Sequence, residues 1–200
     1  MASPLTKVNT LWQAVGGAIL APILVMLIII DGFMYSYLTT FQTFLFLNLA
    51  FLFFQEFEGY ILNPNGLQGF FNKYKTGKKR AQKIVKPMSE QLILTVNGTA
   101  WGWAILAATL ANTAPWIGVS FLITNSLVNI LSHTVLFQLH HKSYNPGLIT
   151  VVFLFIPLYT AIVWYSIAFS VLSPSEWTIA ILIGIGMALL MSAALRARKK

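Results

Sequence analysis

Six long stretches of this 200-residue sequence contain no Asp, Glu, Lys or Arg, and they constrain the fold more than any other feature. A helix rises about 1.5 Å per residue, so about 20 residues cross the roughly 30 Å hydrocarbon core of a bilayer. Charged residues make up only 9% of the chain, whereas about 25% is usual for a soluble domain. We therefore predict an all-α integral membrane bundle of six transmembrane helices, forming a single membrane domain over residues 1–200.

The predicted spans follow the apolar runs. They cover Leu11–Ile30, Tyr37–Phe54, Gln91–Ala111, Pro115–Leu139, Leu148–Leu172 and Trp177–Leu195. Only the pair Asp31-Gly32 separates the first apolar run from the second, so we predict a short break between these two spans. The first run is too long for the core of a typical signal peptide, and we expect it to remain as a span.

The Lys and Arg residues indicate the orientation. With six spans, all 13 cations fall on one side of the membrane, whereas the opposite loops carry only Asp31 and Glu176. Cytoplasmic loops are enriched in Lys and Arg, so we predict that this side and both termini are cytoplasmic. We expect a multi-pass protein of the plasma membrane.

A basic loop at residues 61–90 joins the second and third spans and carries more than half of the cations. These are Lys73, Lys75, Lys78, Lys79, Arg80, Lys83 and Lys86. Each cation near an anionic lipid surface contributes about 1 kcal/mol of attraction. Aromatic residues interleave with the cations, as in nucleic-acid binders, but a membrane loop needs no such partner. We therefore expect anionic headgroups, and no nucleic acid, to contact this loop.

Several polar residues lie at membrane depth, where each one costs free energy. Asn125, Asn129 and His133 are spaced by four and so share one helix face. Asn97 and His133 lie roughly 10 and 12 Å from the basic side at about 1.5 Å per residue. We predict that a polar cluster forms in the cytoplasmic half, with ligand-binding candidates Gln55, Glu58, Asn97, Asn129 and His133.

Three interpretations of this cluster stay open. The side chains can hydrogen-bond between helices, line a ligand or substrate pocket, or hold a metal ion. Glu58 and His133 are weak metal-ligand candidates, because a catalytic zinc centre needs about three protein ligands. We assign no catalytic residue and expect no cofactor, with a divalent metal as the alternative.

Two stretches carry a resemblance to a known family. QEFEGYILNPNGLQGFFN, from Gln55, and SYNPGLIT, from Ser143, resemble motif regions of the HXXEE-motif membrane proteins, over about Leu38 to Pro157. The resemblance implies a small polytopic membrane protein of unestablished function. The family's polar motifs, HxxEE, NxxHE and HxxxH, have suggested a metal-dependent membrane enzyme.

The family's motifs are incomplete in this sequence. The resemblance places Gln55 and Gly59 at a His and a Glu of the first motif, and Ala100 and Trp101 at the His and Glu of the second. Glu58, Asn97 and His133 are kept, and Asn129 stands at the first His of the third motif. We therefore expect a member without a metal site, in which Glu58 serves helix contacts and Glu56 is an interfacial charge.

These inferences favour a non-catalytic membrane subunit or a binder of a small amphiphile, and a membrane-protein partner is a further expectation. The first alternative is a metal-dependent integral-membrane hydrolase acting on a lipid-like substrate. The second is a transporter or channel, which is disfavoured because the spans lack Asp, Glu, Lys and Arg.

Overall fold

The structure, a computed structural model, describes residues 4–62, 89–141 and 144–197. Every regular element in these ranges is a helix, and short π-helical segments (η) alternate with α-helices. The elements are α1 (Pro4–Val15), η1 (Gly16–Leu20), α2 (Ala21–Ile30), η2 (Asp31–Tyr35), α3 (Thr40–Glu56), η3 (Phe57–Ile61), α5 (Glu90–Thr109), α6 (Pro115–Phe121), η4 (Leu122–Leu127), α7 (Val128–Ile130), η5 (Leu131–Leu136), α8 (Phe137–His141), α9 (Leu148–Thr150), η6 (Val151–Phe155), α10 (Ile156–Ala168) and α11 (Pro174–Ala197).

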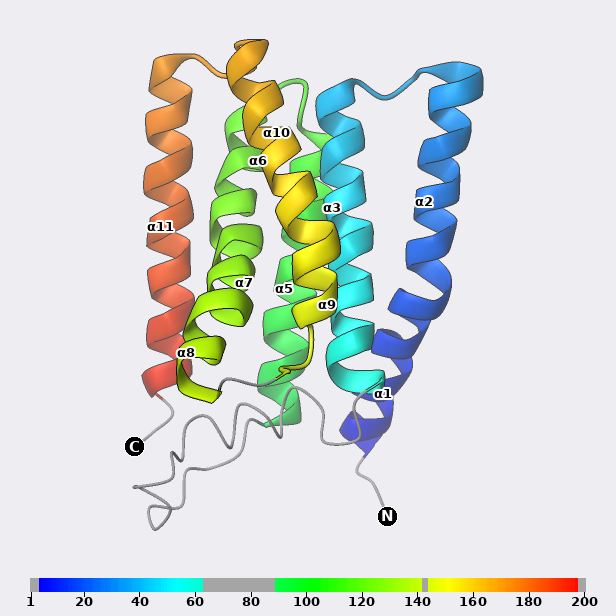
Figure 1. The fold of residues 1–200 in the computed structure, drawn as a ribbon, viewed down its shortest axis with the longest axis vertical. Coiled ribbons are helices and arrows are strands. Elements are labelled where there is room, and N and C mark those ends of the chain that lie inside the picture. Colours follow the sequence, from blue (N-terminus) through cyan, green and yellow to red (C-terminus); the bar gives the residue numbers. More distant parts are fainter. Residues whose placement is uncertain (1–3, 63–88, 142–143, 198–200) are drawn as a thin grey trace.

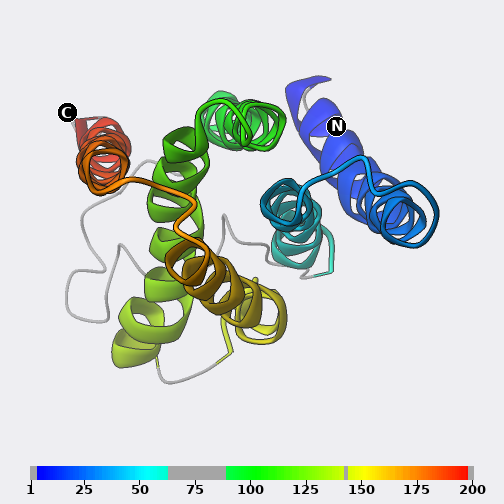
Figure 2. The same ribbon diagram turned by 90° about the horizontal axis from the view of Figure 1, so that it is seen from above.

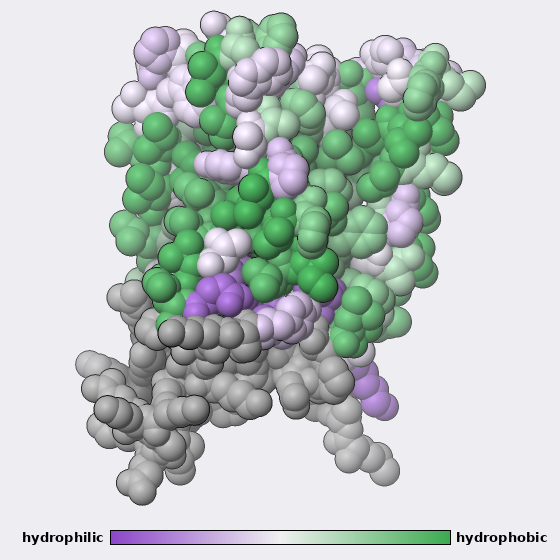
Figure 3. Space-filling model, in the orientation of Figure 1, coloured by the Kyte–Doolittle hydropathy of each residue, from purple (hydrophilic) through white to green (hydrophobic). Residues whose placement is uncertain are grey.

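These elements join end to end into six helical columns that are long and apolar enough to cross a membrane. The columns are Pro4–Tyr35, Thr40–Ile61, Glu90–Thr109, Pro115–Leu139, Leu148–Ala168 and Pro174–Ala193. Figure 1 shows them standing side by side, and Figure 3 shows apolar side chains covering the middle height of the bundle. The prediction of an all-α fold with six helices of spanning length is confirmed for the described residues.

The positions of the first and last described helices agree with an even number of membrane crossings. The start of α1 and the end of α11 lie at the same end of the bundle (Figure 1). The prediction that this end faces the cytoplasm stays a prediction. The basic loop, predicted at residues 61–90, falls largely on residues 63–88, outside the described residues.

The predicted span boundaries differ from the observed ones by up to seven residues: the first helix begins at Pro4 rather than Leu11, and the first two spans end later than predicted. The first helix continues through Asp31 to Tyr35 and ends at Ser36, whose φ of 54° is left-handed. The Asp31 carboxylate accepts hydrogen bonds from the backbone N–H groups of residues 37 and 38, at 2.9 and 3.0 Å, and so holds the turn that follows. The second helix continues past Phe54 to Ile61, because no proline lies between these residues and a helix tolerates the single glycine, Gly59.

The α3 helix lies at the centre of the bundle. Its buried residues include Leu45 and Phe53, which belong to two apolar clusters shared with the surrounding helices. The α11 helix lies at the edge (Figure 2) and packs mainly against α6 and η4. There the Thr124 hydroxyl donates to the Gly184 carbonyl at 3.0 Å. A side chain at Gly184 would lie 2.7 Å from Ile123, so glycine allows this close approach.

Candidate functional site

Glu58 holds the segment that leads into the fifth helical column. Its carboxylate, which is 6% exposed, accepts hydrogen bonds from the Tyr144 hydroxyl at 2.7 Å and from the backbone N–H of Gly147 at 3.1 Å. It also accepts from the N–H of Ile149 at 3.2 Å and from both the N–H and the hydroxyl of Thr150. The first N–H groups of a helix have no partner within the helix, and a negative charge there is favourable. Glu58 thus caps the start of α9.

His133 forms a second part of the same network. Its Nδ1 lies 2.5 Å from Asn145 Oδ1, and Asn145 Nδ2 donates to the His133 carbonyl at 3.0 Å. Its Nε2 lies 3.3 Å from Gln55 Nε2. Because an amide nitrogen only donates, these contacts fit a neutral imidazole that donates from Nδ1 and accepts at Nε2. Both ring nitrogens are therefore occupied by protein groups.

Gly147 connects the two parts. Its N–H bonds Glu58, and a Cβ built on it would lie 2.9 Å from Cε1 of His133 and 3.4 Å from Cγ of Gln55. Its φ of 94° is left-handed, which an L side chain rarely adopts. The structure thus brings Gln55, Glu58 and His133 together around one turn. We call this group, with Tyr144, Asn145, Gly147 and Thr150, the polar network.

Asn129 and Asn97 lie outside the polar network. Asn129 bonds Asn125 at 3.4 Å along its own helix. It lies in α7 between the π-helical segments η4 and η5. The i→i+5 bonding of π turns changes the side-chain spacing, and a common face for Asn129 and His133 stays a prediction. Asn97 lies on α5, and its Nδ2 is buried without a hydrogen-bond partner. The assignment of Asn97 and Asn129 as ligand-binding residues stays a prediction.

Glu56 corrects a prediction. It is 5% exposed rather than interfacial, because it points from α3 toward α5, where Trp101 Nε1 donates to its Oε1 at 2.9 Å. Its Oε2 has no hydrogen-bond partner, and neither do Gln13 Nε2 of α1 and Asn97 Nδ2 of α5. Three neighbouring helices therefore each carry one buried polar atom without a partner.

The residues at the family's motif positions do not fit a metal centre. The lone pairs of Glu58 and His133 face protein hydrogen-bond donors, and the amide nitrogen of Gln55 faces His133. Trp101 packs its ring 4.0 Å from that of Trp12 and 4.2 Å from that of Phe53, by centroids. Within the described ranges, no group of three His, Cys, Asp or Glu side chains is placed to hold a metal ion.

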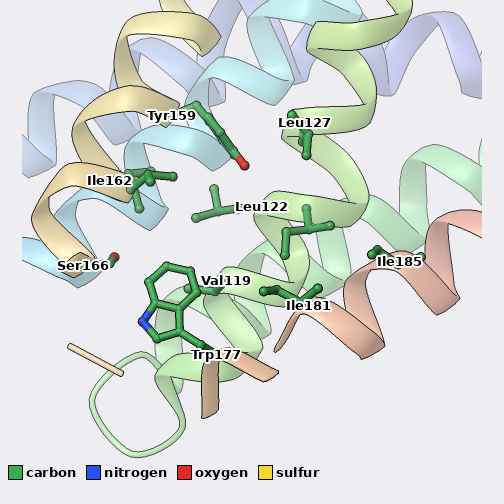
Figure 4. A pocket seen from close by; sticks show the side chains of 11 residues that line it. Val119, Leu122, Leu127, Tyr159, Ile162, Ser166, Trp177, Ile181 and Ile185 are labelled. Atoms are coloured by element: carbon green, nitrogen blue, oxygen red, sulfur yellow. The ribbon is translucent and has the colours of Figure 1, made fainter. Parts of the chain in front are cut away.

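The structure also contains a cavity that was not predicted from the sequence. It has a volume of about 290 Å³ and lies between α6–η4, α10 and α11 (Figure 4). It is lined by Val119, Leu122, Ile123, Leu127, Tyr159, Ile162, Val163, Ser166, Trp177, Ile181 and Ile185. Because it depends on how three helices pack, no local pattern in the sequence indicates it.

Tyr144, Asn145, Gly147 and Thr150 were not among the predicted site residues either. A signal was present, because all four lie in SYNPGLIT, the second stretch that resembles the family. Pro-Gly is typical of a turn, and here it stands directly before an apolar span. The pattern therefore indicates a backbone turn at the edge of the membrane. Such a turn needs partners for its N–H groups, and a carboxylate supplies them.

The comparisons with known proteins agree with the resemblance. The model of a family described as "Protein of unknown function with HXXEE motif" matches residues 45–162. No curated protein matches the chain, and no solved structure does. The matched residues include every member of the polar network, and the suspected family resemblance is confirmed.

Proposed function

This chain belongs to the HXXEE-motif family of unknown function, and we propose that it is a non-catalytic member that binds a small amphiphile in the membrane. The proposal rests on one observation above all. The hydrogen-bonding groups of the two kept acid–base residues, Glu58 and His133, are used by the protein itself. A reactive centre needs such groups directed at a substrate or at a metal ion.

The polar network then has a structural role. Gln55 belongs to α3, Glu58 to η3, His133 to η5 and Thr150 to α9, and the remaining members lie in the turn before α9. Hydrogen bonds among them tie three helical columns together at one end of the bundle. Unpaired polar groups are costly at membrane depth, so a complete network favours a single arrangement of these helices.

The binding role is supported by the apolar cavity between α6–η4, α10 and α11. Ligand sites are mostly apolar, with a few polar groups that orient the ligand. The cavity lining fits this description, because aliphatic and aromatic side chains surround Ser166 and Tyr159. A soluble polar metabolite would find few hydrogen-bond partners in this cavity, whereas an amphiphile would bury its apolar chain there.

The experiment is native mass spectrometry of the protein purified in a mild detergent, together with elemental analysis. We expect a small-molecule adduct that organic solvent extracts, and no stoichiometric zinc, manganese or iron. Stoichiometric metal that is lost in His133→Ala, while that variant remains folded, would support the metal-dependent hydrolase instead. Protein without adduct that co-purifies with another membrane protein would support the subunit role.

A further inference from the structure

One part of the cavity lies far from the polar network along the membrane normal. Ser166 is sixteen residues after Thr150 in one helical column, which places the two about 24 Å apart at 1.5 Å per residue. Ser166 lies near the end of α10 and Trp177 near the start of α11, and these two helix ends lie at the same end of the bundle (Figure 1). The part of the cavity beside Ser166 and Trp177 therefore lies toward the end of the bundle opposite the polar network.

Ser166 carries a polar atom that the protein leaves without a partner. The residue is 0% exposed, so a ligand oxygen reaches it only after a small shift of the side chains around it, and its hydroxyl makes no hydrogen bond. Hydroxyl side chains in helices commonly donate to the carbonyl four residues earlier. Thr124, Thr134 and Thr160 all do so here, at 2.7 to 2.9 Å. A buried hydroxyl without such a bond costs free energy unless a ligand pairs with it.

We propose that this cavity binds an uncharged single-chain amphiphile whose head-group oxygen hydrogen-bonds the Ser166 hydroxyl. Burying a charge without a partner is far more costly than burying a neutral hydroxyl. The lining contains no Asp, Glu, Lys, Arg or His. An alcohol, or an ester of a small polyol, therefore fits better than a fatty acid or a phospholipid head group. This inference rests on the proposed function and gives it a place and a ligand class.

The size of the cavity limits the chain. A buried apolar cavity of about 150 Å³ in another protein holds one benzene molecule. By that scale, 290 Å³ accommodates about twelve non-hydrogen atoms. The lining runs from residue 119 to 127 on one column and from 177 to 185 on another, which is about 12 Å along a helix axis. The site suits one alkyl chain of medium length, or the part of a longer alkyl chain that is nearest the head group.

The ligand reaches the cavity from the lipid. The α11 helix packs mainly on α6 and η4, whereas α10 packs on α3. Few contacts between α10 and α11 therefore separate the cavity from the lipid. Two lining residues of α11, Ile181 and Ile185, are 41% and 49% exposed. With the head near Ser166 and Trp177 and the chain toward Leu127 (Figure 4), the ligand has the orientation of a lipid in that leaflet.

The test is titration of the whole protein with decan-1-ol, followed by native mass spectrometry. We expect saturable binding of one molecule to the wild type, about two- to tenfold weaker binding to Ser166→Ala, as for loss of one neutral hydrogen bond, and no binding to Ile181→Trp. Leu182→Trp adds the same ring to the neighbouring residue, which is 66% exposed and does not line the cavity. It should bind like the wild type, as should Ser192→Ala.

A second measurement locates the head group. The probe 2-bromodecan-1-ol carries a heavy atom beside its hydroxyl and should quench Trp177 fluorescence. The saturable part of the quenching should disappear in Trp177→Phe. Equal affinity for decanoate would overturn the ligand class. Wild-type binding that Ser166→Ala and Ile181→Trp leave unchanged would overturn the location but keep the proposed function, whereas no saturable binding to any protein would overturn both.

Discussion

Gln55 Nε2 lies 3.3 Å from His133 Nε2, although 78 residues separate the two in sequence. The resemblance to the family places Gln55 where the first motif has a histidine, and a neutral imidazole offers a lone pair that an amide nitrogen lacks. A glutamine amide instead donates a hydrogen bond to the neutral imidazole. Both partners of this pair are therefore bonded within the protein.

Replacing His133 should destabilise the fold. His133→Ala leaves Asn145 Oδ1 and Gln55 Nε2 buried without partners, and each such group costs about 1–3 kcal/mol. We expect the free energy of unfolding in detergent to fall by about 2–4 kcal/mol, measured by denaturant titration. Asn129→Ala is the matched control, because Asn129 makes only one bond, to Asn125, and it should cost less. Equal stability of the two variants would contradict the structural role of His133.

Glu58→Gln tests the cap on α9. Glutamine keeps the size of the side chain, but its NH₂ group replaces an oxygen that accepts hydrogen bonds, so donors such as the Thr150 N–H face another donor. We expect a loss of about 2–4 kcal/mol, since hydrogen bonds to a charged group are among the stronger ones. Hydrogen exchange at residues 147–150 should also become faster. Glu176→Gln makes the same change at the exposed start of α11 and should have a smaller effect.

Gly147→Ala should be poorly tolerated. The residue has a φ of 94°, and an added Cβ would lie 2.9 Å from the His133 ring. The left-handed conformation alone costs an alanine about 1–2 kcal/mol, and the clash adds to it. Gly98→Ala provides the contrast, because nothing lies within 4 Å of its Cβ position. Within a helix that change should stabilise by roughly 0.5–1 kcal/mol. Thermal unfolding of the two variants in parallel compares them, and a neutral Gly147→Ala would refute the geometry.

The bond between Trp101 and Glu56 can be isolated with a double-mutant cycle. Trp101→Phe keeps an aromatic ring against Trp12 and Phe53 but removes the N–H that Glu56 accepts. We expect it to cost about 1–2 kcal/mol in the wild type and clearly less in a Glu56→Met background, where no acceptor remains. Additive effects of the two changes, measured by denaturant titration, would mean that this hydrogen bond contributes nothing.

The predicted orientation can be tested by cysteine labelling, because the chain contains no cysteine. In sealed vesicles of known orientation, a membrane-impermeant maleimide should label Lys78→Cys only from the cytoplasmic side. It should label Ser175→Cys, in the first turn of α11, only from the other side. The expectation follows from the excess of Lys and Arg in cytoplasmic loops. Labelling of both positions from one side would overturn the six-span topology.

The family positions could be located from the sequence, but their contacts could not. Counting residues predicts Glu58, Asn97 and His133 in one half of the membrane, but it did not reveal that the amide nitrogen of Asn97 is buried without a hydrogen-bond partner. Nor did it reveal that Glu56 is buried against Trp101. The direction of a side chain depends on the helix turn that carries it, and π-helical turns such as η3 and η5 change that direction.

The sequence by itself determined that this chain forms six apolar helices of spanning length, because the cost of burying charges in lipid is local to each segment and depends on composition. Only the tertiary structure decided which polar groups meet. Glu58 and Thr150, for example, are 92 residues apart in sequence and are joined by a hydrogen bond. The tertiary structure also decided where the cavity beside Ser166 lies. Both depend on how helices distant in sequence pack, and that packing is not encoded in any single segment.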